Sequence, residues 1–100
     1  MTHVGMAIIF LATLFAQDNP SQKENLYSWQ LQFQTYDQCV SFFDEYGDKL
    51  LYGLIIHAKQ HYGKEMGIEY VSCANVKMDM TQSQPEVIGQ RTVYLSLIHI

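Results

Sequence analysis

Cys39 and Cys73 are the only cysteines among the 100 residues, and pairing them is the chemistry that the sequence most directly offers. Their separation excludes the C-x-x-C spacing of a redox pair. In small exported domains an even number of cysteines usually forms disulfides. Closing a loop of about 35 residues would stabilise the fold by about 4 kcal/mol in the chain-entropy model. We therefore predict a Cys39–Cys73 disulfide, and the alternative is two buried thiols in a reducing cytosol.

His57 and His61 are the other residues whose spacing fits a chemical role. Four positions apart on a helix, their side chains share one face, with Glu65 one turn further along. Two imidazoles in this arrangement are typical ligands of a divalent metal such as zinc. The segment lacks the glutamate that follows the first histidine in zinc proteases, and Lys59 supplies no general base. A metal site at His57 and His61 is therefore a weak candidate, and two half-exposed histidines are the simpler interpretation.

Composition and motifs narrow the classes of function. The formal net charge is −4, and no run of Lys or Arg provides the basic face that a nucleic-acid partner requires. The sequence contains no nucleophile elbow, phosphate-binding loop or glycine-rich nucleotide fingerprint. We therefore predict no enzyme activity, no catalytic residues, no cofactor and no nucleic-acid partner.

The N-terminal segment Val4–Ala16 is an uncharged apolar run followed at once by a polar, turn-forming stretch. It is too short to span a bilayer as a helix but has the length of a signal-peptide core. We predict a hydrophobic helix that directs export, with cleavage after Ala16. The alternatives are an uncleaved membrane anchor, which would limit membrane contact to residues 1–16, and a buried N-terminal helix of a cytoplasmic protein.

Apolar and polar residues alternate strictly over residues 26–34, which predicts a half-buried strand with Trp29, Leu31 and Phe33 on one face. Thr35 and Gln38 then have the spacing of a capping box. The apolar periodicity that follows predicts a helix ending at Gly63, with a kink near the middle. We expect the two elements to form one core, with these three strand residues packed against Val40, Phe43, Leu50 and Leu54.

Residues 68–78 are rich in β-formers and predict a second strand, and residues 87–95 allow a third. If Cys73 bonds to Cys39, both it and Val71 must face the helix. A bulge near Ala74 or Asn75 would then be needed to return Val76 to the core. The last residues, 95–100, resemble translated adapter read-through, so we treat them as a candidate non-native tail.

The predicted fold is a small α+β domain of strand, long helix, strand and a third strand. Its predicted organisation is a signal peptide or anchor at 1–16, a polar linker at 17–25, the domain at 26–94 and the tail. The leading functional hypothesis is an exported, secreted or periplasmic protein, closed by a disulfide, that binds a protein or an envelope component. The alternatives are a membrane-anchored accessory subunit and a metal-binding protein or enzyme using His57 and His61.

Overall fold

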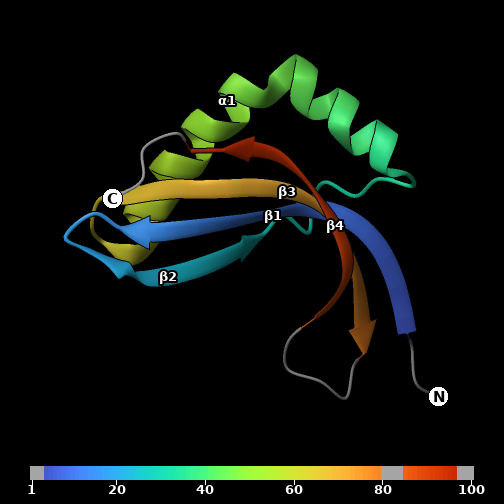
Figure 1. Cartoon of the computed structure of the whole chain (residues 1–100), viewed down its shortest axis with the longest axis horizontal. Helices are drawn as coiled ribbons and strands as arrows, with labels where there is room; N and C mark the ends of the chain where they lie inside the picture. Colours follow the sequence, from blue (N-terminus) through green and yellow to red (C-terminus); the bar gives the residue numbers. More distant parts are fainter. Residues whose placement is uncertain (1–3, 80–84, 97–100) are drawn as a thin grey trace.

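A computed structural model describes residues 4–79 and 85–96. The chain forms a four-stranded antiparallel sheet in the order β2-β1-β3-β4, and one long helix lies across one face of it (Figure 1). The α+β fold predicted from the sequence is therefore confirmed. The elements along the chain are β1 (Val4–Ala16), β2 (Asn19–Tyr27), α1 (Tyr36–Tyr62), β3 (Met66–Asp79) and β4 (Glu86–Leu95).

The apolar N-terminal segment is the central strand β1, so the predicted N-terminal hydrophobic helix is wrong. β1 pairs with β3 along its whole length and with β2 from Leu11 to Ala16. Its side chains alternate between two covered faces, and both Ile9 and Leu14 have an exposed fraction of 0 %. A strand buried on both faces has a continuous apolar sequence, which is also the pattern of a signal-peptide core. A signal peptide is not supported, because cleavage after Ala16 would remove the middle of the sheet.

The polar segment after β1, expected to be a linker at 17–25, forms most of the edge strand β2, which runs from Asn19 to Tyr27. Most of its side chains are exposed, which explains its polar sequence, and an edge strand tolerates Pro20 because no partner needs its missing N–H. The folded unit therefore begins at β1 rather than at residue 26. The strand predicted over 26–34 is also wrong beyond Tyr27, since the chain continues there as a loop.

Helix α1 begins and ends where its capping residues predict. Thr35 Oγ1 accepts a hydrogen bond from the backbone N–H of Gln38 (3.1 Å), while the Gln38 side chain accepts one from the backbone N–H of Gln34. Gly63 ends the helix in the left-handed conformation (φ 70°), and its N–H donates to the Lys59 carbonyl. The helix is continuous, and its axis arches over the sheet (Figure 1).

The main core fills the space between α1 and the sheet, and the prediction of its composition is correct in part. Leu31 and Phe33 pack there with the four helix residues that the sequence indicated. Trp29 is 37 % exposed, and its ring stacks on that of Tyr27 at a centroid separation of 5.6 Å. A second, smaller cluster on the other face of the sheet contains the buried residues Ile9, Leu11, Ala74 and Val76.

Strand β3 orients Cys73 and Val71 toward the helix, as the disulfide requires. The predicted return of Val76 to this core is wrong, because Val76 belongs to the cluster on the opposite face. The extra residues of the β3–β4 pairing, Ile88 and Val93, lie in β4. Relative to β1, the register shift of β3 lies at Glu69, and β3 alternates without interruption from Tyr70 to Asp79. β4 is the third strand that the sequence allowed. Of the candidate non-native tail, residues 97–100 lie outside the described residues.

Candidate ligand-binding groove

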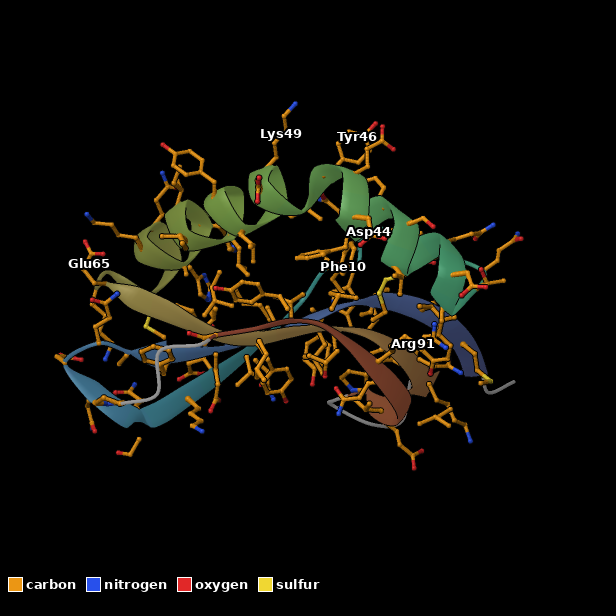
Figure 2. The ribbon with its side chains drawn as sticks, turned by 45° about the horizontal axis from the view of Figure 1, so that its top comes forward. Phe10, Asp44, Tyr46, Lys49, Glu65 and Arg91 are labelled. Atoms are coloured by element: carbon orange, nitrogen blue, oxygen red, sulfur yellow. A yellow bond between two sulfur atoms is a disulfide. The ribbon has the colours of Figure 1, made fainter. Side chains whose placement is uncertain are left out.

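An apolar groove of about 550 Å³ lies between the middle of α1 and the region where β2 ends against β1. Three parts of the chain enclose it: the helix-facing side of the sheet, the inner side of α1 and the loop that follows β2. Figure 2 shows Phe10 extending from the sheet toward the helix in this region. The groove is lined by Phe10, Ala12, Leu26, Tyr27, Ser28, Trp29, Gln30, Leu31, Phe43, Lys49, Leu50, Leu51, Gly53, Leu54, His57 and Val71.

The loop that follows β2 forms one wall of the groove, because the chain leaves the edge of β1 after Ser28 and returns to it at Phe33. The Ser28 N–H donates to the Phe10 carbonyl (3.0 Å), and the chain pairs with β1 again at Phe33, whose N–H donates to the Ile8 carbonyl (2.8 Å). The intervening residues form a turn in which the Leu31 N–H donates to the Ser28 carbonyl. The loop is therefore fixed to the sheet at both ends and holds Trp29 and Leu31 beside the groove.

The floor of the groove is apolar and centred on Phe10. This residue lies on β1, and its ring contacts those of Phe33, Phe42 and Phe43 at centroid separations of 5.5 to 6.1 Å. Ala12 on the same strand and Val71 on the neighbouring strand β3 continue the floor, and both are buried. Small side chains at these two positions leave room between the sheet and the helix.

The roof of the groove is formed by α1, with Leu50, Leu51 and Leu54 facing the sheet and half-buried. Gly53 also lines the groove, and a Cβ atom added there would have no heavy atom within 4 Å. Glycine is unfavourable in a helix interior relative to alanine by ~1 kcal/mol. Gly53 therefore leaves this part of the groove unfilled, although a side chain at position 53 would meet no neighbouring atom.

The polar groups of the groove are few. The Ser28 hydroxyl accepts a hydrogen bond from the Phe10 N–H (3.1 Å) and donates to the Phe10 carbonyl (3.3 Å), so it fastens the loop to β1. Lys49 and His57 are both exposed side chains of α1 at the rim. The described lining residues include no carboxylate.

The two histidines singled out from the sequence are adjacent, but Glu65 does not join them. Their rings are nearly parallel, with centroids 5.8 Å apart. The Glu65 carboxylate instead accepts a hydrogen bond from the Lys59 ammonium (2.9 Å). Within residues 4–79 and 85–96, no three potential metal-ligating side chains come together. Binding of a metal by this pair stays a prediction.

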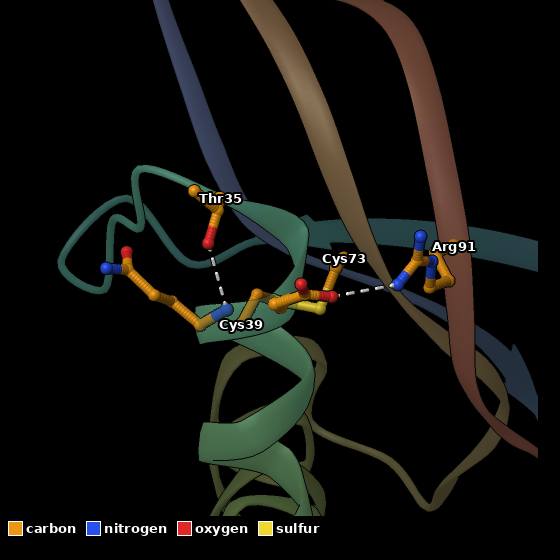
Figure 3. A network of polar contacts seen from close by, with 6 residues as sticks. Thr35, Cys39, Cys73 and Arg91 are labelled. Atoms are coloured by element: carbon orange, nitrogen blue, oxygen red, sulfur yellow. Dashed lines mark hydrogen bonds and ion pairs between the residues drawn. A yellow bond between two sulfur atoms is a disulfide. The ribbon is translucent and has the colours of Figure 1, made fainter.

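The predicted disulfide is present and fastens the first turn of α1 to the middle of β3 (Figure 3). The Cα atoms of Cys39 and Cys73 are 6.1 Å apart, and both residues have an exposed fraction of 0 %. Nearby, the Arg91 guanidinium of β4 lies 3.4 Å from the Asp37 carboxylate and over the Tyr36 ring. A disulfide is compatible with an oxidising extracellular or periplasmic location.

The other end of α1 carries Lys59 and Tyr62, whose pKa values are both raised in the folded protein. Burial raises the pKa of the Tyr62 hydroxyl, and the nearby Glu24 carboxylate raises it further. The hydrogen bond and charge of Glu65 raise the pKa of the exposed Lys59 ammonium.

In the part of the chain that the structure describes, no helix is long and apolar enough to cross a membrane.

The groove could not be predicted from the sequence, because its walls come from segments far apart in the chain and no local sequence pattern shows that these segments meet. Phe10 and Ala12 lie in the run that resembled a signal peptide, and Trp29 was assigned to a strand face. The glycine at position 53 inside an apolar helical stretch was the one local signal. No family model, curated protein or solved structure matches the chain. What the groove holds must therefore be inferred from its own residues.

Proposed function

We propose that this protein is a small-molecule binding protein that takes an elongated apolar ligand into the groove between α1 and the β1–β2 end of the sheet. The observation that carries the proposal is the groove itself, whose volume of about 550 Å³ is walled mainly by aliphatic and aromatic side chains. Sites for small molecules are typically concave and mostly apolar, with volumes of about 300 to 1,000 Å³. Filling this groove would remove apolar surface of both partners from water.

The energetics favour a ligand with a hydrocarbon chain. Each CH₂ group removed from water contributes about 0.8 kcal/mol, so a chain of several carbons would offset the entropy lost on binding. The groove is also largely pre-formed, because its walls are held in place before a ligand binds. The loop wall is hydrogen-bonded to β1 at Ser28 and Phe33, and the disulfide and the Thr35 cap fix the start of the roof helix.

The disulfide also supports a proposal about location. Both sulfur atoms belong to fully buried residues in a chain of 100 residues, where a cross-link supplies much of the stability. We place the protein in an oxidising compartment, secreted or periplasmic, where such a bond persists. Its ligand would then be a molecule of the extracellular space or the cell envelope.

The test uses Trp29, the only tryptophan of the chain and a lining residue of the groove. Titration of the oxidised full chain with 1-decanol, a neutral linear probe, should change the Trp29 fluorescence in a saturable manner. Gly53→Leu should weaken binding at least tenfold, because the new side chain would fill the groove. Gly53→Ala is the matched control, since both substitutions remove the helix glycine but alanine occupies little of the groove.

Thermal unfolding of the two Gly53 variants separates occlusion from misfolding. Both should be at least as stable as the parent chain, because removing a glycine from a helix interior stabilises it by ~0.5 to 1 kcal/mol. Equal decanol affinity in Gly53→Leu and Gly53→Ala, or no saturable signal in the parent chain, would contradict the proposal.

A further inference from the structure

The last two turns of α1 carry two histidines whose rings lie side by side. The rings of His57 and His61 are within 9° of parallel, and their centroids are 5.8 Å apart. Both side chains are exposed, and neither forms a hydrogen bond or ion pair with any residue that the structure describes. The nitrogen atoms of both imidazoles are therefore available to a ligand from solvent.

The separation of the two rings suits a shared metal ion. Zinc binds an imidazole nitrogen at about 2.0 to 2.1 Å, and this nitrogen lies about 1.15 Å from the centre of its ring. Two imidazoles on one zinc ion therefore have centroids at most about 6.4 Å apart, and about 5.2 Å apart at the tetrahedral angle. The observed separation of His57 and His61, 5.8 Å, lies between these values. Rotation of the two exposed side chains can place both nitrogens on one ion while the helix backbone stays unchanged.

The electrostatic surroundings of the pair favour a cation. His61 lies in the last turn of a 27-residue helix, where the terminal carbonyl groups carry a partial negative charge. Lys59 is the one Lys or Arg between the two histidines, and its ammonium bonds to the Glu65 carboxylate (2.9 Å). This ion pair balances the positive charge of Lys59. A metal ion on the two imidazoles would therefore meet no unpaired lysine within the last turns of the helix.

We propose that His57 and His61 together bind one Zn²⁺ ion, with water in the remaining coordination positions. Imidazole nitrogen suits zinc and related transition metals, whereas Mg²⁺ prefers oxygen ligands. Both cysteines of the chain are held in the disulfide and supply no competing thiolate. Among the described residues no third potential ligand joins the pair, so the two imidazoles are the protein's share of the site. The metal site is independent of the apolar ligand and is tested with the metal alone.

The experiment is calorimetric titration of the oxidised full chain with Zn²⁺ at about pH 7.5, where imidazole is mostly neutral and can bind metal. The parent chain should bind Zn²⁺ saturably and should give no saturable signal with Mg²⁺. His57→Ala and His61→Ala should each weaken Zn²⁺ binding at least tenfold, because the second imidazole binds in an intramolecular step. Zn²⁺ should also raise the Tm of the parent chain, since the folded helix is the state that holds the two imidazoles together.

The matched control combines His57→Ala with Gln60→His. It has as many histidines as the parent chain, but side chains at neighbouring helix positions do not face each other and cannot share an ion. Its Zn²⁺ affinity should fall as far as that of His57→Ala alone. Circular dichroism should show the same helix content in every variant, because the substituted side chains are exposed. The site is refuted if the parent chain does not bind Zn²⁺, if either alanine variant binds it as tightly as the parent chain, or if the control does.

Discussion

Phe15 and Gly67 face each other across the β1–β3 pair, and the Phe15 ring lies over the backbone of the glycine. A Cβ atom placed on Gly67 would lie 2.3 Å from the Cζ atom of that ring. Glycine usually weakens a strand, but here it provides the space in which an aromatic side chain of the neighbouring strand packs. The pair therefore depends on the absence of a side chain at position 67.

Gly67→Ala should destabilise the protein by about 1 to 3 kcal/mol, the usual range for adding atoms to a filled site. Urea denaturation measures the change. Gly5→Ala is the control, because an added Cβ there has open space around it. In a Phe15→Leu background the effect of Gly67→Ala should shrink, since the ring that causes the clash is gone. Equal effects in both backgrounds would show that the ring does not set the requirement.

Leu14→Ala should lower the free energy of unfolding by about 3 kcal/mol, because Leu14 is fully buried in β1 and its loss leaves a cavity. Met6→Ala, in the same strand but at a residue 61 % exposed, should have little effect. Equal small effects would mean that the N-terminal segment is not part of the folded sheet. Mass spectrometry of the folded protein should also find residues 4–16 still attached.

Replacing both cysteines, Cys39→Ala with Cys73→Ala, should destabilise the protein by about 4 kcal/mol in the chain-entropy model for a loop of this length. The parent chain should show no free thiol under native conditions, because both residues are fully buried and bonded. Thiol titration before and after denaturation, with and without reductant, checks this. Two thiols titrating in denatured, unreduced protein would contradict the disulfide.

Tyr62 should make the stability depend on pH in the alkaline range. Its pKa is raised in the folded state, so its contribution is fully present below the ordinary tyrosine pKa of about 10 and is lost as pH rises through the folded value. Tyr62→Phe should therefore reduce the loss of stability above about pH 10. Tyr52→Phe, at a residue 70 % exposed, is the control. Identical pH profiles for the parent chain and Tyr62→Phe would refute the effect.

Local chemistry was sufficient to predict the helix and the cross-link. Thr35 with Gln38 and the left-handed Gly63 fix the bounds of α1, because caps act through bonds within a few residues. The Cys39–Cys73 pair followed from the number of cysteines and the size of the chain. The strands β3 and β4 also followed from their β-branched and aromatic residues.

The role of Val4–Ala16, the existence of β2 and the groove were decided only by the tertiary structure. An uncharged apolar run fits a signal peptide and a doubly buried strand equally well, and only its pairing with β3 and its cover by α1 distinguish them. β2 is polar because it lies at an edge, so its sequence resembles a linker until β1 is known to be its neighbour. The groove joins Phe10, Trp29 and Leu54, which come together only when the helix crosses the sheet, because no local pattern records contacts between such distant segments.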